Sequence, residues 1–466
     1  MKKTAATLLA CLLSVIVLAQ DITGQWNGVL KVQGMQLRLV FHITKTDTGY
    51  SATLDSPDQG AKDIPTTSAN FENLVLKIAV ASIGAGYEGT LENDTIITGT
   101  FKQMGQSFPL NLSRATIEKE PLIRPQEPVK PYPYNEEEVV FDNPMDGVTL
   151  AGTFTYPRTN GTFPAVVLIS GSGAQNRDEE LMGHKPFLVL ADYLTKNGIA
   201  VLRFDDRGTA KSTGNFQIAT SLDFSKDVES AVKYLQTRKE VYQKKIGLVG
   251  HSEGGMIAPM VAARSKEVAF IVLLAGVGIP GEQLLLLQQE LIAKASGLDE
   301  ADWQKAQKVN QGAFEIIIQS TQQVELQKDL ITYFKQVAQD IPRAGIPEGV
   351  TENDLVNMAV SRIYTPWMQY FIKYNPAPAL EKVKCPVLAI NGDKDLQVPA
   401  KINLEAIKSA LQKGGNKKVT IKELPGLNHL FQEAETGLPT EYATIEQTFS
   451  PVALNEITEW IKIQTK

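Results

Sequence analysis

The chain has 466 residues, more than one hydrophobic core usually serves, so we expect two domains or one domain with a large insertion. Hydrophobic residues make up 43% and charged residues 21%, which are ordinary globular values and exclude a chain that is disordered throughout. The net charge of -6 leaves no excess of basic residues for a phosphate backbone, so nucleic acid is not an expected partner.

The N-terminus is typical of a secretory signal. Met1-Lys2-Lys3 precedes an apolar run over residues 5–18, and a small residue, Ala19, comes before Gln20-Asp21. The run is too short to predict a membrane span, and no other segment approaches its length without charges. We therefore expect 1–19 to be a signal peptide and the mature protein to be exported, periplasmic or secreted, with no membrane span.

Cysteine usage predicts neither a disulfide nor a metal site. Cys11 lies within the expected signal peptide, and Cys385 is then left alone in an apolar run, where a small core residue is the commoner role. Cysteine and histidine do not cluster at metal-ligand spacing in the sequence. We expect no metal and no cofactor, and the sequence does not indicate an oligomeric state.

Residues 20–115 have the period-two pattern of β-strands. Apolar residues at odd positions from Met35 to Ile43 alternate with mostly polar neighbours, and similar short segments recur up to Leu112. We predict a small all-β accessory domain here, a meander that closes into a barrel or sandwich. Residues 116–138 contain five prolines among charged residues, which favours a semi-rigid linker at the domain boundary.

From residue 139 onward, strands alternate with helices. The pattern predicts a hairpin over 139–156, strands over 165–169, 199–204, 245–249, 269–276, 387–390 and 419–424, and helices over 187–196, 222–237, 402–411 and 454–463. Such an alternation predicts an α/β domain over 139–466, with a mostly parallel sheet that helices cover on both faces. Active sites on such sheets lie beyond the carboxyl ends of the strands.

Residues 279–382 interrupt this alternation. They carry helical patterns without strand signals, over a length far beyond an ordinary crossover connection. We therefore expect a helical cap inserted over the site.

Residues 245–258 join a short apolar strand to a helix of small residues through Gly250-His251-Ser252-Glu253-Gly254. This is the G-x-S-x-G nucleophile elbow, in which a strained turn lifts the serine hydroxyl above the sheet while the two glycines avoid a collision. The N-terminus of the helix offers unpaired N–H groups to an oxyanion. The motif therefore indicates acyl transfer, with Ser252 as the nucleophile.

A serine nucleophile needs a base, and a third group must orient that base. Of the four histidines, His42 lies in the β domain and His251 must point away from the serine. His429 follows the strand 419–424 and fits the chain order serine, acid, histidine. His184 comes before the serine, and we expect it to be a pocket or surface residue.

The orienting acid is expected in the loop after strand 387–390. Asp393 and Asp395 both come within reach of the sheet edge, and capping of local backbone is the alternative role for each. We take Asp395, because its spacing to Val398-Pro399 matches G-x-x-D-x-x-V-P loops, and keep Asp393 as the alternative.

The oxyanion hole requires two N–H donors. One is the residue after the nucleophile, Glu253, and the other comes from the glycine-rich loop 170–178 after the strand 165–169. Ser172 is our choice in this loop, with Gly173 as the alternative. A phosphate-binding loop is excluded because no G-K-[ST] follows.

Five groups of residues carry a resemblance to a known family. They are Gly171-Ser172-Gly173 with Arg177-Asp178-Glu179, Asp206-Arg207-Gly208 with Lys211-Ser212-Thr213-Gly214, Gly250-His251-Ser252-Glu253-Gly254-Gly255, Asp395 with Gln397-Val398-Pro399, and Leu427-Asn428-His429-Leu430-Phe431. In this order they resemble bacterial alpha/beta-hydrolase esterases of the EstD type, near the serine aminopeptidase-like (S33) hydrolases, from about Glu137 to the C-terminus.

The resemblance implies a carboxylesterase that acts on short acyl esters, with its catalytic triad on Ser252, Asp395 and His429. Two positions depart from the pattern of these families. Ser170 stands where relatives outside this group often have histidine, which leaves the oxyanion donor open, and Ala210 replaces a glycine in a structural loop.

Three functions follow as hypotheses. The first is a serine carboxylesterase with a small-molecule ester as substrate. The second is a serine aminopeptidase-like peptidase, for which Glu179 and Glu180 near the pocket would bind an amine. The third belongs to another class, an envelope or glycan-binding protein with a vestigial hydrolase domain.

Overall fold

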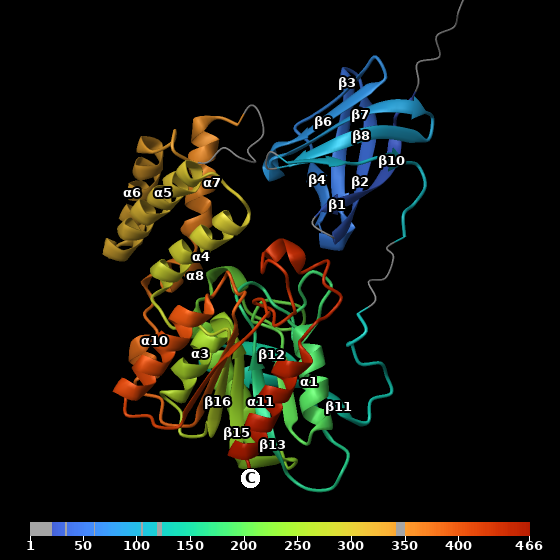
Figure 1. The fold of residues 1–466 in the computed structure, drawn as a ribbon. Coiled ribbons are helices and arrows are strands. Elements are labelled where there is room, and N and C mark those ends of the chain that lie inside the picture. The colour runs from blue at the N-terminus through green and yellow to red at the C-terminus, as the bar shows by residue number, and fades with distance from the viewer. Residues whose placement is uncertain (1–20, 33–34, 60, 104–105, 119–123, 342–349) are drawn as a thin grey trace, which may run out of the picture. The chain divides into compact units, whose positions relative to one another are not determined.

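The computed structural model describes residues 21–32, 35–59, 61–103, 106–118, 124–341 and 350–466, and the expected signal peptide lies outside them. The chain forms two compact units, drawn in Figure 1, one within residues 21–118 and the other within residues 124–466. Each unit has hydrophobic clusters of its own.

The first unit is an antiparallel sheet that closes on itself. Its strands follow the order β10-β1-β2-β3-β5-β6-β7-β8-β9, and the ring closes because β10 pairs with both β1 and β8, while β4 pairs with β3. The strands are β1 Gly24–Val32, β2 Met35–Thr46, β3 Gly49–Ser56, β4 Ala61–Pro65, β5 Ser68–Glu72, β6 Val75–Val80, β7 Ala85–Asn93, β8 Ile96–Gln103, β9 Gln106–Pro109 and β10 Leu112–Ser113. The prediction of a small all-β fold is confirmed, as a barrel rather than a sandwich.

The period-two pattern explains how the barrel is filled. Alternate side chains of a strand face opposite sides, so the apolar set points inward. Trp26, Phe41, Leu54 and Ile97 are accordingly buried in one cluster.

The second unit contains an 8-stranded sheet in the order β11-β12-β14-β13-β15-β16-β17-β18. The first three strands pair in antiparallel fashion, and all the remaining pairs are parallel. The strands are β11 Tyr134–Asn143, β12 Val148–Pro157, β13 Phe163–Ile169, β14 Ala200–Phe204, β15 Val241–His251, β16 Phe270–Leu274, β17 Val387–Gly392 and β18 Val419–Leu424. The predicted α/β class with a mostly parallel sheet is confirmed.

Helices pack on both faces of this sheet (Figure 1). α1 and α11 contribute to one hydrophobic cluster, and α2, α3 and α10 contribute to the other. Their bounds are α1 Pro186–Lys196, α2 Ser221–Gln236, α3 Glu253–Ala262, α10 Ala400–Lys413 and α11 Pro451–Gln464. Local signals fix where they begin: α1 starts on Pro186, and α2 starts at a reciprocal capping box between Thr220 and Asp223.

The interruption after β16 is helical, as its pattern predicted. It contains α4 Gly281–Ala295, α5 Glu300–Gln319, α6 Gln323–Gln336, α7 Glu352–Ile363, α8 Pro366–Lys373 and α9 Ala377–Leu380. Val277, Leu284, Phe371 and Val398 form a separate apolar cluster with Met256 of α3, which joins this insertion to the sheet unit.

Part of the expected linker packs onto the second unit. The guanidinium of Arg124 is buried and donates hydrogen bonds to four backbone carbonyls, those of Met182, Gly183, Ala443 and Ile445. The hairpin also begins at Tyr134, five positions before the expected start of the α/β domain at residue 139. The proline-rich pattern shows no apolar periodicity that would reveal this attachment.

Candidate active site

Ser252 stands between the end of β15 and the start of α3, at the turn that its motif predicted. Its φ of 53° lies in the left-handed region, which is strained for any residue with a side chain. A Cβ on Gly250 would approach the Gly254 carbonyl oxygen to 2.0 Å, and a Cβ on Gly254 would approach the Ile169 carbonyl oxygen to 2.1 Å. Both glycines are therefore required for the turn to close against β13.

The backbone after the serine begins α3, and the first N–H groups of a helix have no partner inside it. Glu253 supplies one of these N–H groups. Ser172, the other sequence-predicted oxyanion residue, lines the same cavity as Ser252 and Glu253. Gly171 lies close to Ser252, because a Cβ added there would stand 3.3 Å from the serine Cβ.

His429 and Asp395 form a buried pair. His429 Nδ1 lies 2.7 Å from Asp395 Oδ2, and both side chains are almost fully removed from solvent. The other carboxylate oxygen, Asp395 Oδ1, accepts the backbone N–H groups of Gln397 and Val398, each at 2.8 Å. Since these N–H groups fix the carboxylate, Oδ2 is left to accept the ring N–H, and Nε2 is left as the basic nitrogen of the imidazole.

The residue before the serine contacts the loop that carries His429. His251, the residue before Ser252, donates from Nε2 to the His429 carbonyl oxygen at 2.9 Å, and the two rings lie 4.8 Å apart between centroids. Among the described residues, His429 Nε2 has no hydrogen-bond partner within 3.5 Å, Ser252 included. Hydrogen bonds between catalytic groups are often long in unliganded enzymes and shorten when substrate binds.

The two alternative residues have other roles in the structure. Asp393 is exposed, and its Oδ1 accepts the N–H of Gly426 at 2.7 Å, which is the turn-capping role. The expectation that His184 is a pocket or surface residue is wrong, since its side chain is fully buried. Its Nε2 lies 2.8 Å from the Tyr442 carbonyl oxygen and 3.1 Å from the amide nitrogen of Gln432, and its Nδ1 lies 2.9 Å from the Thr448 hydroxyl. Burial, together with the nearby charge of Arg124, lowers the pKa of His184 to about 4.

Three buried carboxyl groups lie near the candidate oxyanion residues. Asp206 accepts the Ser170 hydroxyl at 2.9 Å and the Gln175 N–H at 3.0 Å, and its burial raises its pKa well above the ordinary value. Glu253 Oε1 accepts the Ser221 hydroxyl at 2.6 Å. The third carboxyl group belongs to Glu179.

Trp367 of α8 also reaches Glu253. Its indole N–H donates to Glu253 Oε1 at 2.8 Å, so the residue after the serine is joined to the helical insertion through its side chain. Burial raises the pKa of Glu253, and the two hydrogen bonds oppose that rise.

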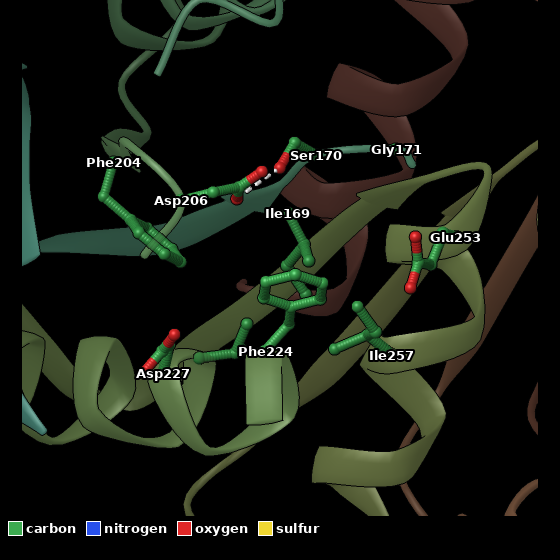
Figure 2. Close-up of a pocket in the computed structure, with 10 residues that line it drawn as sticks. Ile169, Ser170, Gly171, Phe204, Asp206, Phe224, Asp227, Glu253 and Ile257 are labelled. Atoms are coloured by element: carbon green, nitrogen blue, oxygen red, sulfur yellow. Dashed lines mark hydrogen bonds between the residues drawn. The ribbon is translucent and has the colours of Figure 1, made fainter. Parts of the chain in front are cut away.

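Figure 2 shows Ser170 and Asp206 joined by their hydrogen bond, with Glu253 at the start of α3. These residues line a cavity of about 10 Å³, which has room for about one water molecule and excludes a substrate. This small cavity lies among residues that contact or support the loop 170–178, the candidate oxyanion loop.

The cavity at Ser252 is larger, with a volume of about 240 Å³. Its wall combines polar residues from the loops of the sheet unit with apolar residues, most of them from α4 and α8. The lining consists of Ser172, Ser252, Glu253, Val277, Leu284, Leu285, Gln288, Trp367, Met368, Phe371, Gln397 and Val398. A small compound with an apolar part fits such a space.

Within the described ranges, His, Cys, Asp and Glu do not gather into any group that could hold a metal ion. Over the same residues, no helix combines the length and apolar character needed to span a membrane.

The known proteins to which this chain is similar include a family of acyl-CoA thioester hydrolases and an esterase. Residues 227–434 match the family described as BAAT / Acyl-CoA thioester hydrolase C terminal. Esterase EstD of Thermotoga maritima is 26% identical over 337 residues, which cover 72% of this chain and 69% of that protein. The resemblance to EstD-type esterases is confirmed. An uncharacterized 31.7 kDa protein of Escherichia coli is 24% identical over 252 residues, which cover 54% of this chain and 78% of that protein.

Solved structures of lower similarity were also found. The Pyrococcus furiosus esterase Pf2001 is 16% identical, with a TM-score of 0.43, and the match covers 72% of this chain and 92% of that one. The alpha/beta hydrolase GrgF from Penicillium sp. sh18 is 17% identical, with a TM-score of 0.45 and coverage of 71% and 99%.

Sequence reasoning missed how Glu179 and His251 are used. Glu179 was expected to face the pocket and bind an amine, but it is buried and its carboxylate contacts His251 and Gly171. His251 was excluded as the base because it points away from the serine, and nothing in its position revealed what it would meet. Trp367 was also missed, because its helical pattern does not show which face covers the cavity.

Proposed function

We propose that this protein is a serine carboxylesterase that hydrolyses short-chain acyl esters through an acyl-enzyme intermediate. The observation that carries the proposal is the buried 2.7 Å contact of His429 Nδ1 with Asp395 Oδ2, on a loop held against the turn that presents Ser252. The similarity to Esterase EstD and to the acyl-CoA thioester hydrolase family supports an ester or thioester as the substrate.

The proposed steps use groups already described. His429 Nε2 takes the proton of the Ser252 hydroxyl, while the serine oxygen attacks the ester carbonyl carbon. The N–H groups of Ser172 and Glu253 hold the oxyanion of the tetrahedral intermediate. The C–O bond to the alcohol then breaks, and His429 returns the proton to the leaving alcohol.

Water completes the cycle. His429 removes a proton from a water molecule that attacks the acyl-serine. As the second tetrahedral intermediate breaks its C–O bond to the serine and releases the carboxylic acid, His429 returns the proton to the Ser252 oxygen. Asp395 stabilises the imidazolium that forms in each half of the reaction.

The size and lining of the cavity support a small acyl group. Its 240 Å³ lies below the usual range for drug-sized ligands, and Leu284, Leu285 and Phe371 give it an apolar wall. We propose that the acyl chain lies against this wall. The expected export signal leads us to propose further that the enzyme works in the periplasm or outside the cell.

A thioester is the second candidate substrate, because residues 227–434 match the thioester hydrolase family. The same acyl-enzyme route serves both substrates, with a thiol leaving in place of an alcohol. The peptidase hypothesis loses part of its support, since Glu179 is engaged inside the protein and only Glu180 is exposed.

The test measures hydrolysis of p-nitrophenyl acetate, p-nitrophenyl butyrate, butyryl-CoA and an aminoacyl p-nitroanilide by the wild type, Ser252→Ala and Ser296→Ala. Ser296 is an exposed serine at the end of α4 and serves as the control. We expect ester hydrolysis and fluorophosphonate labelling to be lost only in Ser252→Ala. Equal rates in the wild type and Ser252→Ala would overturn the proposal, and faster turnover of the anilide or the thioester would change the substrate class.

A further inference from the structure

Behind the candidate triad lies a second carboxylate–imidazole contact. Glu179 Oε1 accepts the Gly171 N–H at 2.6 Å and lies 2.9 Å from Nδ1 of His251. The other ring nitrogen, Nε2, lies 2.9 Å from the carbonyl oxygen of His429. The side chains of Glu179 and His251 are 5% and 8% exposed, so water does not replace these partners.

The partners of His251 determine its protonation. A backbone carbonyl only accepts hydrogen bonds, so Nε2 must carry a hydrogen. Glu179 Oε1 already accepts the Gly171 N–H and, as a carboxylate oxygen, also accepts from Nδ1. A ring that donates from both nitrogens is an imidazolium, and the charge of Glu179 beside it compensates for its own.

The surroundings of the ring agree with this assignment. In the described part of the chain, the titratable groups that face His251 are Glu179, His429 and Asp395. Burial by itself lowers the pKa of His251, but the attraction and hydrogen bond of Glu179, helped by the His429 carbonyl, outweigh it, and the pKa lies above its ordinary value.

We propose that Glu179 is a positioning residue for the esterase reaction, acting through a buried ion pair with His251. Its carboxylate ties the oxyanion loop, at Gly171 next to Ser172, to the imidazolium of His251, and that ring ties the turn before Ser252 to the loop of His429. Three loops that supply the nucleophile, the base and an oxyanion donor are thus held in one hydrogen-bonded chain. This inference rests on the proposed function.

The backbone supports a dedicated role for Glu179. Its φ of 51° lies in the left-handed region, which is uncommon for a residue with a long side chain. This strained residue is the one whose Oε1 contacts both the Gly171 N–H and Nδ1 of His251. Small displacements of reacting groups are costly in catalysis, since an error of about 1 Å lowers the rate by up to about 100-fold.

The first test is spectroscopic and does not depend on activity. The sequence contains four histidines, so ¹⁵N-histidine labelling gives few ring signals. We expect one ring to be protonated on both nitrogens at pH 8 in the wild type. Its signal should be absent in His251→Asn and should become that of a neutral ring in Glu179→Gln, because the amide carries no compensating charge. A singly protonated His251 in the wild type at pH 8 would overturn the proposal.

The second test is kinetic and uses the full-length protein. For Glu179→Gln we expect kcat on p-nitrophenyl butyrate to fall about 10- to 100-fold, with KM within about twofold, because positioning is felt in the transition state. Thr195→Val is the matched control, since it removes a buried 2.7 Å hydrogen bond to Thr155 in the same unit, away from the cavity. Glu179→Gln and His251→Asn should not be additive, because they break the same chain of contacts.

Folding effects are separated by measuring the Tm of each variant and assaying well below the lowest value. If Glu179→Gln loses thermal stability but keeps the wild-type kcat, its role is structural only and the proposal fails. If the wild type hydrolyses no ester, the proposed function fails and takes the positioning role with it, while the ring signals still report whether the ion pair exists.

Discussion

At the scale of single residues, hydrogen-bond partners decide what each histidine can do. His184 is enclosed by a hydroxyl, a carbonyl and the amide nitrogen of Gln432, and its lowered pKa favours the neutral ring. His251 lies between a carboxylate and a carbonyl oxygen, which is the arrangement of the proposed imidazolium. His429 gives one N–H to Asp395 and keeps Nε2 as a base. The same side chain therefore serves as a structural group, an ion-pair partner and a candidate catalyst.

The orientation of His429 predicts the effect of Asp395→Asn. The asparagine oxygen would keep the N–H groups of Gln397 and Val398, and its NH2 group would then face Nδ1 and force the proton onto Nε2. A ring of that tautomer does not accept the serine proton, so kcat should fall about 1,000-fold or more. Asp393→Asn is the control, because an amide oxygen still accepts the Gly426 N–H. Similar rates in the two variants would contradict the assignment.

The buried His184 predicts a dependence of stability on pH. Its pKa is about 4 in the folded protein, against an ordinary value of 6.5. Between these values the unfolded chain binds a proton that the folded chain does not, so the free energy of unfolding falls as the pH drops from about 6.5 to 4, by at most about 3 kcal/mol. Urea unfolding of the wild type and His184→Gln between about pH 6.5 and 4 measures this change in the free energy of unfolding. The dependence of the free energy of unfolding on pH should weaken in His184→Gln. It should persist in His42→Gln, whose site lies in the barrel.

At the scale of elements, the site depends on how α3 and α8 meet. The elbow glycines let α3 approach β13, and Trp367 of α8 bonds to the first residue of α3. A helix of the insertion is therefore fixed to the residue whose backbone N–H is the candidate oxyanion donor. The Trp367–Glu253 hydrogen bond therefore joins the wall of the cavity to the candidate oxyanion hole.

Trp367→Phe should loosen that attachment while keeping an aromatic ring in place. The loss of the indole N–H leaves buried Glu253 with one donor fewer, which costs about 1 kcal/mol of stability. We expect KM for p-nitrophenyl butyrate to rise several-fold with a smaller change in kcat. Trp460→Phe in α11 is the control, since it removes an indole bond to Thr420 at 3.1 Å outside the cavity lining. Equal KM values for both variants would show that Trp367 does not shape the site.

At the scale of the whole molecule, each unit contains the core it needs. The barrel encloses its own apolar cluster, and two further clusters lie on the two faces of the second sheet. The second unit also includes the segment with Arg124, whose four carbonyl contacts all fall within it. The candidate site uses residues of this unit alone.

Fragments of the chain test this division. A fragment of residues 120–466 should fold and keep the esterase kcat within about threefold, because it contains the site and its supporting core. A fragment of residues 139–466 should be insoluble or inactive, since it lacks Arg124 and the first part of β11 and leaves four carbonyls without their donor. Circular dichroism, Tm and p-nitrophenyl butyrate hydrolysis compare the two. Equal behaviour would show that the segment before residue 139 is only a connection.

Local features could be predicted from the order of residue types. The period of two predicted the barrel strands, the alternation of apolar runs and amphipathic helices predicted the second sheet, and Gly250 and Gly254 predicted the turn at Ser252. Each of these signals is a pattern of residue types within a short stretch of chain, so it can be read before the partners of that stretch are known.

The remaining features depend on which distant residues the fold brings together. It placed Glu179 and Trp367 against the residues on either side of Ser252, buried His184 away from the pocket, and attached Arg124 to loops about 60 and 320 positions further along the chain. A polar side chain is satisfied by whichever partner the fold brings within about 3 Å, and that partner leaves no periodic mark in the sequence.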